Sequence, residues 1–391
     1  MAIIIEGITT LLTLCGLAYL LLALWSARAF NHHARKAAPL PGTPSPDVSI
    51  LKPVKGIDPR MYAGFVSHCQ QHYTGAFEIL FGVSSLEDPA VQEIHRLQAE
   101  FPGLSIRLVE CPERFGTSGK VSNLVQLLRT ARYPHILIND SDIRVAPLYL
   151  ARVMAPFTDA QVGMVTAPYI GRAVPSANTN RIVLWSKLEA LGIATDFMPG
   201  VLTARTLEGG LRFGLGSTLA FSRAALAKAG GLDPLADFLA DDYELGRRIA
   251  VAGYRVELAA EVVETTVPPY TLRGFWEHQI RWARSTRDSR KLGYVGLGIT
   301  YALPWAIVTC IASGLALWSF TLLSVVLLAR VAVALTVGVG ILRDEQVLRD
   351  LWLLPLRDLA GLLFWIWSFA GDTVLWRGER FRLHNGRITP A

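Results

Sequence analysis

Long apolar stretches lie at both ends of this chain of 391 residues, and the segment between them follows a different pattern. Residues 3–25 contain a single charge, Glu6. About twenty apolar residues span the hydrocarbon core of a bilayer, so this stretch predicts a transmembrane helix. A cleaved signal peptide is the alternative, but the apolar run is too long, no basic residues precede it and no small-residue cleavage site follows. We therefore expect a retained anchor.

The apolar region near the C-terminus is longer. Residues 295–342 carry Arg330 as their only charge and are long enough for a hairpin of two membrane-spanning helices. Residues 351–376 are divided by Arg357, Asp358 and Asp372 into pieces too short to span straight through. We expect this last segment to lie in the membrane interface or to re-enter.

Short apolar runs alternate with helical patterns in the middle of the chain. Continuous apolar strands between helices are typical of a parallel sheet covered on both faces, which predicts the α/β fold class. Such sheets bind ligands beyond the carboxyl ends of their strands. Strands are predicted at 47–54, 77–85, 104–110, 135–140 and 216–223, and helices at 60–72, 89–101, 120–131, 223–232 and 239–254.

These patterns divide the chain into six parts. They are a transmembrane anchor, a basic and Pro-rich linker, a sheet domain, an amphipathic interfacial helix, a C-terminal membrane region and a basic tail. Their expected limits are residues 1–27, 28–46, 47–271, 272–291, 292–376 and 377–391.

Composition indicates on which side of the membrane the sheet domain lies and what kind of surface the chain contacts. Hydrophobic residues make up 51% of the chain and charged residues 18%, with a mean hydropathy of +0.35. Basic residues cluster directly after the anchor, which predicts a cytoplasmic sheet domain. The net charge of +6 suits an anionic lipid surface. No nucleic-acid partner is expected, because the basic residues are not interleaved with stacking aromatics. The four cysteines form no disulfide framework.

Paired carboxylates follow one of the predicted strands. Asp140 and Asp142, in NDSDIRV, come directly after the apolar run 135–138. In an extended segment, residues i and i+2 point to the same side, so both carboxylates would face one point. Mg²⁺ and Mn²⁺ choose such oxygen ligands and share them with substrate phosphates. A solvated turn is the alternative.

Three further acidic residues lie at the starts of predicted helices. Asp88 precedes Pro89, and Asp241 and Asp242 precede the helix that is predicted within residues 239–254. Helix capping and stabilisation of the helix dipole explain all three without any chemistry. The alternative for the adjacent pair is a general base, because neighbouring carboxylates repel and raise one pKa.

A basic amphipathic segment stands just before the C-terminal apolar region. Arg281, Arg284 and Arg287 recur at a spacing of three within residues 275–291. An interfacial helix with its arginines on lipid headgroups is one interpretation. It does not exclude a second one, in which Arg281 clamps a diphosphate bidentately.

Six motifs, taken in order, carry a resemblance to one family. The chain resembles the membrane-bound, processive-type inverting glycosyltransferases, and more narrowly the ceramide glucosyltransferases and the related bacterial enzymes that transfer N-acetylglucosamine to hopanoids. The resemblance covers nearly the whole chain. It implies an A-type glycosyltransferase domain, Rossmann-like with a mostly parallel sheet, an N-terminal transmembrane helix and C-terminal transmembrane or interfacial helices. The motifs are ILKPVKGIDP, SSLEDPA, GKVSN, NDSDIRV, ADDYELG and HQIRW.

The resemblance also implies residue roles on the donor side. Asp88 matches an aspartate that contacts the nucleotide, and Lys120 matches a lysine of the nucleotide pocket. Asp140 and Asp142 match the pair that holds the donor diphosphate and a divalent cation, Mg²⁺ or Mn²⁺. The expected cofactor is therefore a divalent cation, and the expected donor is a UDP-sugar.

Further roles implied by the resemblance lie near the acceptor. Asp242 matches the catalytic base, with Asp241 beside it. Arg281 and Trp282 match the last two positions of a Q/R-x-x-R-W motif. His278 stands at the first position, where Gln or Arg is usual, and a His there is commoner among the hopanoid enzymes.

The expected function is inverting transfer of a sugar from a UDP-sugar to the hydroxyl of a membrane lipid, with glucose and ceramide as the first choice. N-acetylglucosamine transfer to a hopanoid polyol is the alternative. One base without a covalent nucleophile implies inversion. A non-catalytic scaffold or transporter stays open, although the chain has no internal repeat. A hydrolase is a further possibility, but the sequence contains no G-x-S-x-G motif of a nucleophile and its base. We expect a multi-pass protein of a bacterial inner membrane, with the catalytic domain in the cytoplasm.

Overall fold

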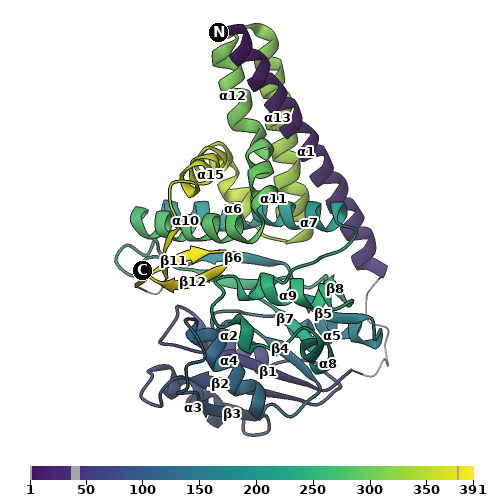
Figure 1. Ribbon diagram of the computed structural model, residues 1–391, viewed down its shortest axis with the longest axis vertical. Coiled ribbons are helices and arrows are strands. Elements are labelled where there is room, and N and C mark those ends of the chain that lie inside the picture. Colours follow the sequence, from purple (N-terminus) through teal and green to yellow (C-terminus); the bar gives the residue numbers. More distant parts are fainter. Residues whose placement is uncertain (1, 37–44, 377) are drawn as a thin grey trace.

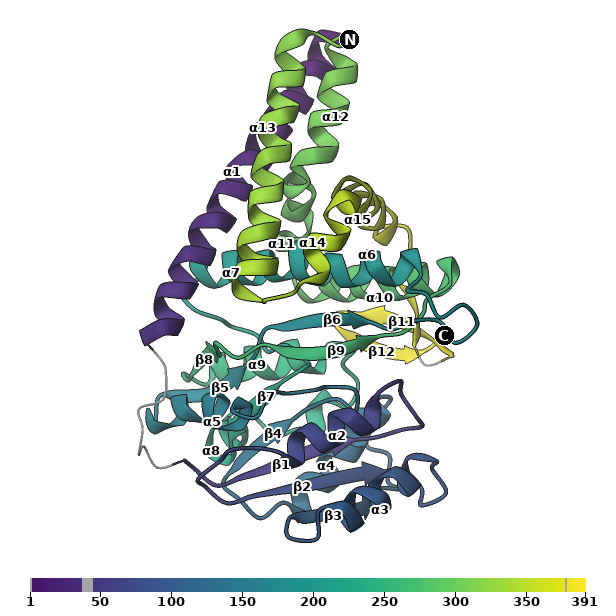
Figure 2. The same cartoon turned by 180° about the vertical axis from the view of Figure 1, so that it is seen from behind.

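The computed structural model has three layers along one long axis (Figure 1). A helical bundle forms one end, a mainly parallel sheet domain forms the other, and crosswise helices lie between them (Figures 1 and 2). The N-terminus lies at the tip of the bundle and the C-terminus lies near the sheet domain. The structure describes residues 2–36, 45–376 and 378–391. Part of the expected linker, 37–44, and Arg377 of the basic tail lie outside the described residues.

A seven-stranded sheet organises the end of the molecule opposite the helical bundle. Its order is β3-β2-β1-β4-β7-β5-β8, in which β7 is antiparallel to both neighbours and every other pair is parallel. The α/β fold class is therefore confirmed, and the five predicted strands are present. The strands are β1 (Val48–Pro53), β2 (Phe77–Val83), β3 (Ser105–Glu110), β4 (His135–Ile138), β5 (Val162–Thr166), β7 (Leu219–Ser222) and β8 (Arg255–Leu258).

Helices between these strands also lie close to their predicted positions. Helix α4 packs on β1 and β2, and helix α9 packs on β5 and β8. The strands β5 and β8 were not predicted, because Gly163 interrupts the apolar run of β5 and the charged residues Arg255 and Glu257 interrupt that of β8. The helices of this domain are α2 (Met61–Cys69), α3 (Ala90–Glu100), α4 (Gly119–Thr130), α5 (Tyr149–Met154), α8 (Arg223–Lys228) and α9 (Asp241–Val251), with 3₁₀ turns at Ala155–Thr158 and Asp233–Leu235.

Two smaller sheets connect the domain to the helices above it. Strands β6 (Tyr169–Ala173) and β9 (Val263–Val267) are parallel and lie between the large sheet and the crosswise helices (Figure 2). The C-terminal residues form an antiparallel sheet rather than a loose tail, with an apolar face that packs on Leu239. Its strands are β10 (Thr373–Trp376), β11 (Glu379–His384) and β12 (Arg387–Pro390).

The bundle consists of α1 (Ala2–Lys36), α12 (Ala302–Ala312) and α13 (Leu317–Val333), which continues as a π-helix over Ala334–Ile341. Helix α1 runs past the expected end of the anchor, so the prediction that the linker begins at residue 28 is wrong. Gly16 allows the close approach of α1 and α12, because a Cβ there would lie 2.7 Å from Ala302 Cα. Small residues permit such contacts between apolar helices.

The crosswise layer joins the bundle to the sheets. Helices α6 and α7 are joined by a π-helical turn, and α10 packs against α15. The elements of this layer and its connections are α6 (Leu184–Gly192), the π-helix Ile193–Phe197, α7 (Met198–Leu207), α10 (Leu272–Ser289), α11 (Lys291–Leu297), α14 (Gln346–Asp350) and α15 (Leu354–Ser368), with 3₁₀ turns at Gly298–Thr300 and Leu351–Leu353.

Three helical segments of the described chain are long and apolar enough to cross a membrane: Ile3–His32, Leu317–Ile341 and Gln346–Ser368. A fourth candidate, Lys291–Thr300 with Ala302–Ala312, is bent by 52° at its break. Figures 1 and 2 show α15 nearly end-on, across the direction of α12 and α13. The helical segment Gln346–Ser368 corrects the expectation that charges divide residues 351–376 into pieces too short to span, and Thr373–Trp376 belong to a strand instead.

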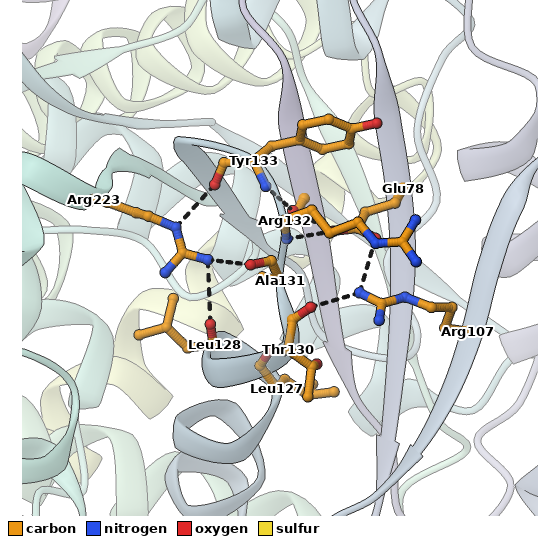
Figure 3. A network of polar contacts seen from close by, with 10 residues as sticks. Glu78, Arg107, Leu127, Leu128, Thr130, Ala131, Arg132, Tyr133 and Arg223 are labelled. Atoms are coloured by element: carbon orange, nitrogen blue, oxygen red, sulfur yellow. Dashed lines mark hydrogen bonds and ion pairs between the residues drawn. The ribbon is translucent and has the colours of Figure 1, made fainter.

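A buried carboxylate closes the amino-terminal end of the large sheet (Figure 3). Glu78 on β2 is 1% exposed and accepts hydrogen bonds from Ser49 Oγ at 2.7 Å, the Arg132 amide at 2.7 Å and Arg107 Nη2 at 2.9 Å. Arg107 and Arg223 also donate to carbonyls at the C-terminal end of α4. These contacts tie β1, β2, β3 and the C-terminal end of α4 together, so Glu78 has a structural role at this end of the sheet.

Candidate active site

At the opposite end of the sheet, three separate segments bring charged side chains together. Lys120, in the first turn of α4, places its Nζ 2.8 Å from Asp140 Oδ1 and 3.6 Å from Asp241 Oδ2. Burial opposes the charged form of Lys120, but Asp140 and Asp241 outweigh burial and raise its pKa. The structure thus joins Lys120, Asp140, Asp241 and Asp242, which the sequence had indicated separately.

The two aspartates at the start of α9 are not helix caps. Ala240 is the N-cap residue and no side chain caps this helix. The pKa of Asp242 is raised to about 6, first by burial and then by the charge of Asp241, while Lys120 acts in the opposite direction. Burial also raises the pKa of Asp241. Gly216 lies against Asp242, because a Cβ there would approach Asp242 Oδ2 to 2.9 Å.

The NDSDIRV segment is a turn, which corrects the expectation of extended backbone. The Ile143 amide donates to the Asp140 carbonyl at 3.4 Å, so the two carboxylates do not repeat at strand spacing. The Asp140 side chain is 41% exposed beside Lys120. Asp142 is half-buried, and its Oδ2 accepts from Thr265 Oγ1 at 2.6 Å and the Thr266 amide at 3.0 Å. Burial raises the pKa of Asp142 against these two bonds.

A buried lysine supports this turn and was not found from the sequence. Lys52 on β1 is fully buried, and its Nζ donates to the Asp140 carbonyl at 3.1 Å. Burial lowers the pKa of Lys52 to about 7, against the nearby charges of Asp142 and Asp140. The sequence feature that could have indicated Lys52 is a single charge inside the apolar strand ILKPV.

The aspartates fit a cation that is shared with a substrate. Among the described residues, no three His, Cys, Asp or Glu side chains form a group that could hold a metal ion alone. Mg²⁺ is commonly bound by one or two carboxylates together with substrate phosphates, rather than by an all-protein cage. Asp140 and Asp142 offer that donor set.

Asp88 has a local structural role. Both of its carboxylate oxygens accept from the Gly56 amide at 3.0 Å, and Oδ1 also accepts from the Ala90 amide at 2.9 Å. It therefore ties the loop after β1 to the start of α3, as the capping interpretation predicted. No contact among the described residues joins Asp88 to Lys120 or Asp140.

Helix α10 carries the HQIRW motif over the same region. His278 stacks on Tyr270 with ring centroids 5.4 Å apart, and it also contacts Trp282 at 5.1 Å. Arg281 lies close enough to Tyr270 to act on its hydroxyl. Glu189 of α6, which the sequence analysis missed, lies 3.1 Å from His278. An acidic residue within the apolar segment KLEALG was the available signal.

Arg284 and Arg287 of α10 do not serve as free headgroup contacts. Arg284 is buried and donates to the carbonyls of Ala370 and Thr373. Arg287 donates to the carbonyls of Ser368 and Gly371. Both side chains bind carbonyls in the segment that connects α15 to the C-terminal sheet. This corrects the expectation that the spacing of three marks a lipid-facing basic stripe.

Comparison with known proteins agrees with this architecture. The chain is 25% identical over 289 residues to ceramide glucosyltransferase 3 of Caenorhabditis elegans, covering 71% of this chain and 59% of that protein. It is 24% identical over 272 residues to ceramide glucosyltransferase 1 of the same organism, covering 68% and 54%. The chain thus spans little more than half the length of these relatives.

A solved structure and a family model extend the comparison. Mannosyltransferase PcManGT from Pyrobaculum calidifontis, in complex with GDP-Man and Mn²⁺, is similar with a TM-score of 0.51 and 21% identity, covering 94% of this chain and 98% of that chain. This likeness confirms the A-type glycosyltransferase fold. The model of glycosyl transferase family 21 matches residues 8–389. Since that match runs from the N-terminal helix to the last strand of the C-terminal sheet, the chain belongs to glycosyl transferase family 21.

Proposed function

We propose that this protein transfers glucose from UDP-glucose to the hydroxyl of ceramide in a membrane, with inversion at the anomeric carbon. The observation that carries the proposal is the cluster of Asp242, Asp241, Lys120 and Asp140 at the carboxyl end of the sheet. The similarity to ceramide glucosyltransferases supports the choice of lipid and sugar.

Asp242 is the proposed general base. The acceptor hydroxyl must lose its proton as its oxygen attacks the anomeric carbon, and a carboxylate with a pKa near 6 is well matched to that task near neutral pH. No second residue is proposed to form a covalent bond to the sugar, so a single displacement inverts the configuration. An α-linked donor then yields a β-linked product.

Positive charge must balance the departing diphosphate. Lys120 and Arg281 are the protein cations that we assign to this task. Asp140 and Asp142 would hold a divalent cation together with the diphosphate, and such a cation supplies electrostatic stabilisation of the leaving group when it is bound. Lys52 keeps the Asp140–Asp142 turn in place through the carbonyl of Asp140.

A row of aromatic rings supports an acceptor path toward the bundle. Tyr169 contacts Phe197 at 5.5 Å, and Phe197 contacts Trp282 at 6.0 Å. The charges of Asp242 and Glu189 both act on the Tyr169 hydroxyl, whose pKa is raised first by burial. The row therefore connects the surroundings of the proposed base with the crosswise helices, where an apolar lipid chain would be tolerated.

The function is tested by incubating the purified protein with radiolabelled UDP-glucose or UDP-N-acetylglucosamine and with ceramide, diacylglycerol or a hopanoid polyol. Mass spectrometry of the lipid extract identifies the product, and NMR of the anomeric proton reports its configuration. We expect β-glucosylceramide. A glycosylated hopanoid would replace ceramide as the acceptor lipid. An α-linked product would overturn the inverting mechanism. Donor turnover without a lipid product would indicate a hydrolase. Binding without turnover would indicate a scaffold.

We also propose that the protein is a multi-pass protein of a bacterial inner membrane, with its catalytic domain in the cytoplasm. The N-terminus is then outside, residues 295–342 form a hairpin, and the C-terminal sheet stays inside. The test uses Gly42→Cys and Gly378→Cys, each in a cysteine-free background, with a membrane-impermeant thiol reagent on intact cells. Neither cysteine should react. Labelling of Gly378→Cys alone would place the C-terminus outside.

A further inference from the structure

Two loops that lie side by side lead into the charged cluster. One loop precedes α4 and Lys120, and the other precedes α9, which begins with Asp241 and Asp242. The Ser118 amide donates to the Ala236 carbonyl at 2.7 Å, so the backbones of the two loops are joined shortly before these charged residues. Ser118 is buried and is also the N-cap residue of α4. The distance between Lys120 and the aspartates therefore depends on how these loops are held.

Asp237, which the proposed reaction does not use, joins the two loops a second time. Its Oδ1 accepts from the Thr117 amide at 2.9 Å and from Thr117 Oγ1 at 3.0 Å. The close approach needs a glycine before Thr117, because a Cβ on Gly116 would lie 2.8 Å from Asp237 Oδ1. One acceptor oxygen thus orders the backbone three residues before Lys120.

The last strand of the chain, β12, pairs with the same segment. The Ile388 amide donates to the Asp237 carbonyl at 2.7 Å, and the Leu239 amide donates to the Gly386 carbonyl at 3.0 Å. The Ile388 carbonyl lies 3.3 Å from Thr117 Oγ1 and is a second acceptor for that hydroxyl. The segment that contains Asp237 therefore runs antiparallel to β12, along the edge opposite β11.

Apolar packing and helix α10 fix the position of β12. Ile388 is fully buried and packs with Leu239 on the apolar face of the C-terminal sheet. Asp288, in the last turn of α10, accepts from the Gly386 amide. The C-terminal sheet lies between α10 and the sheet domain in both views (Figures 1 and 2). It therefore contacts α10 and both of the loops that lead into the charged cluster.

We propose that Asp237 is a positioning residue, held in place by β12, that brings the starts of α4 and α9 together so that Lys120 meets Asp241 and Asp242. The C-terminal strand then controls the rate of transfer, although none of its residues is assigned to the reaction. The effect on transfer rests on the proposed function, whereas the contact of Asp237 with Thr117 and β12 does not.

Two substitutions of similar size at Asp237 test the proposal. Asp237→Asn keeps an oxygen that can accept both bonds from Thr117, so kcat should stay near that of the native protein. Asp237→Leu has no acceptor, and kcat should fall on the order of 10²-fold, the loss expected when a reacting group is misplaced by about 1 Å. Asp233→Leu, the same change at an exposed position of the same loop, is the control and should leave kcat unchanged.

A correction for folded protein separates positioning from a loss of stability. The stoichiometry of UDP-glucose binding, measured by isothermal titration calorimetry, gives the fraction of binding-competent molecules, and kcat is expressed per such molecule. The loss in Asp237→Leu should persist after this correction. A corrected kcat equal to that of the native protein, or an equal loss in Asp237→Asn, would overturn the proposal.

A second pair of substitutions tests the contribution of β12. Ile388→Ala removes the buried side chain but keeps the amide that donates to the Asp237 carbonyl, whereas Ile388→Pro removes both. Proline is tolerated on the edge of a sheet, where no ladder hydrogen bond is lost. The corrected kcat of Ile388→Pro should therefore lie well below that of Ile388→Ala. Equal values would show that the strand does not hold Asp237 and would contradict the proposal.

Hydrogen exchange with peptide mass spectrometry provides a readout that needs no turnover. In Asp237→Leu, peptides that cover 115–121, 236–242 and 384–391 should exchange faster than in the native protein, while peptides from β1 and β2 stay unchanged. Unchanged exchange in the first three peptides would overturn the contact. Faster exchange throughout the domain would show a general stabilising role instead. If no UDP-sugar is turned over, the proposed function fails, while this experiment still decides whether Asp237 joins the loops to β12.

Discussion

Carboxylates lie at both ends of the large sheet, buried at one end and half-buried at the other, and their surroundings are opposite. Glu78, at the amino-terminal end, has hydrogen-bond donors and arginines on both oxygens (Figure 3). Asp242, at the carboxyl end, accepts one hydrogen bond among the described residues, from the Tyr243 amide, and shares the charge of Lys120 with Asp140 and Asp241. A carboxylate that accepts hydrogen bonds from several protein donors stabilises the fold. A carboxylate that is partly desolvated but has few donors has a raised pKa, and it can act on a substrate.

The largest expected effect separates catalysis from binding at the carboxyl end. Asp242→Asn should reduce transfer by about 10²- to 10⁴-fold, the usual contribution of a general base, while UDP-glucose binding stays near that of the native protein. A transfer assay and isothermal titration calorimetry measure the two quantities. If turnover survives the change, the base is Asp241 or another group.

Removal of metal is expected to have the next largest effect. Excess chelator should abolish transfer, and Mn²⁺ or Mg²⁺ should restore it. Asp142→Ala should raise the metal concentration for half-maximal activity on the order of tenfold or more, because one of the proposed oxygen ligands is lost. Full activity of the native protein in excess chelator would show that the NDSDIRV turn has a structural role and does not bind a required metal.

The pH dependence follows from the raised pKa of Asp242. Below about pH 6 the carboxyl is protonated and cannot act as a base, so kcat should fall about tenfold for each pH unit below that value. Between the ordinary aspartate range and pH 6 the folded protein holds a proton that the unfolded chain has released, so this group makes the fold less stable as pH rises. At pH 7.5 the Tm of Asp242→Asn should therefore equal or exceed that of the native protein. A lower Tm would show that the charge stabilises the fold.

The smallest effect on catalysis should come from the amino-terminal end. Glu78→Gln leaves Arg107 and the Arg132 amide without their full partner, which should lower the free energy of unfolding by about 1–3 kcal/mol. The KM for UDP-glucose should stay unchanged. Thermal unfolding in detergent and steady-state kinetics measure the pair of outcomes. Glu113→Gln, in an exposed pair with Arg129, is the control and should alter neither. A changed KM in Glu78→Gln would remove the contrast between the two ends.

Local patterns in the sequence were sufficient for much of the fold. Five strands, the helices between them, and the apolar segments at both ends follow from the repeat of apolar positions, because burial of one face or both faces imposes a short period. The placement of Asp140 and Asp242 near strand and helix ends follows from the same patterns. Short elements such as β5 and β8, and the helical continuation of α1 to Lys36, were missed because their signals are weak or compete with a charged, Pro-rich composition.

Other features were decided only by the tertiary structure. The sequence could not show that Lys120 joins Asp140 and Asp241, that Lys52 is buried beneath the Asp140 turn, or that Glu189 faces His278. It could not show that α15 lies across the bundle (Figure 2) or that Arg284 binds carbonyls of the C-terminal sheet. Each of these contacts joins segments far apart in the chain. Their electrostatic consequences depend on distance and burial, and neither quantity is encoded in a local pattern.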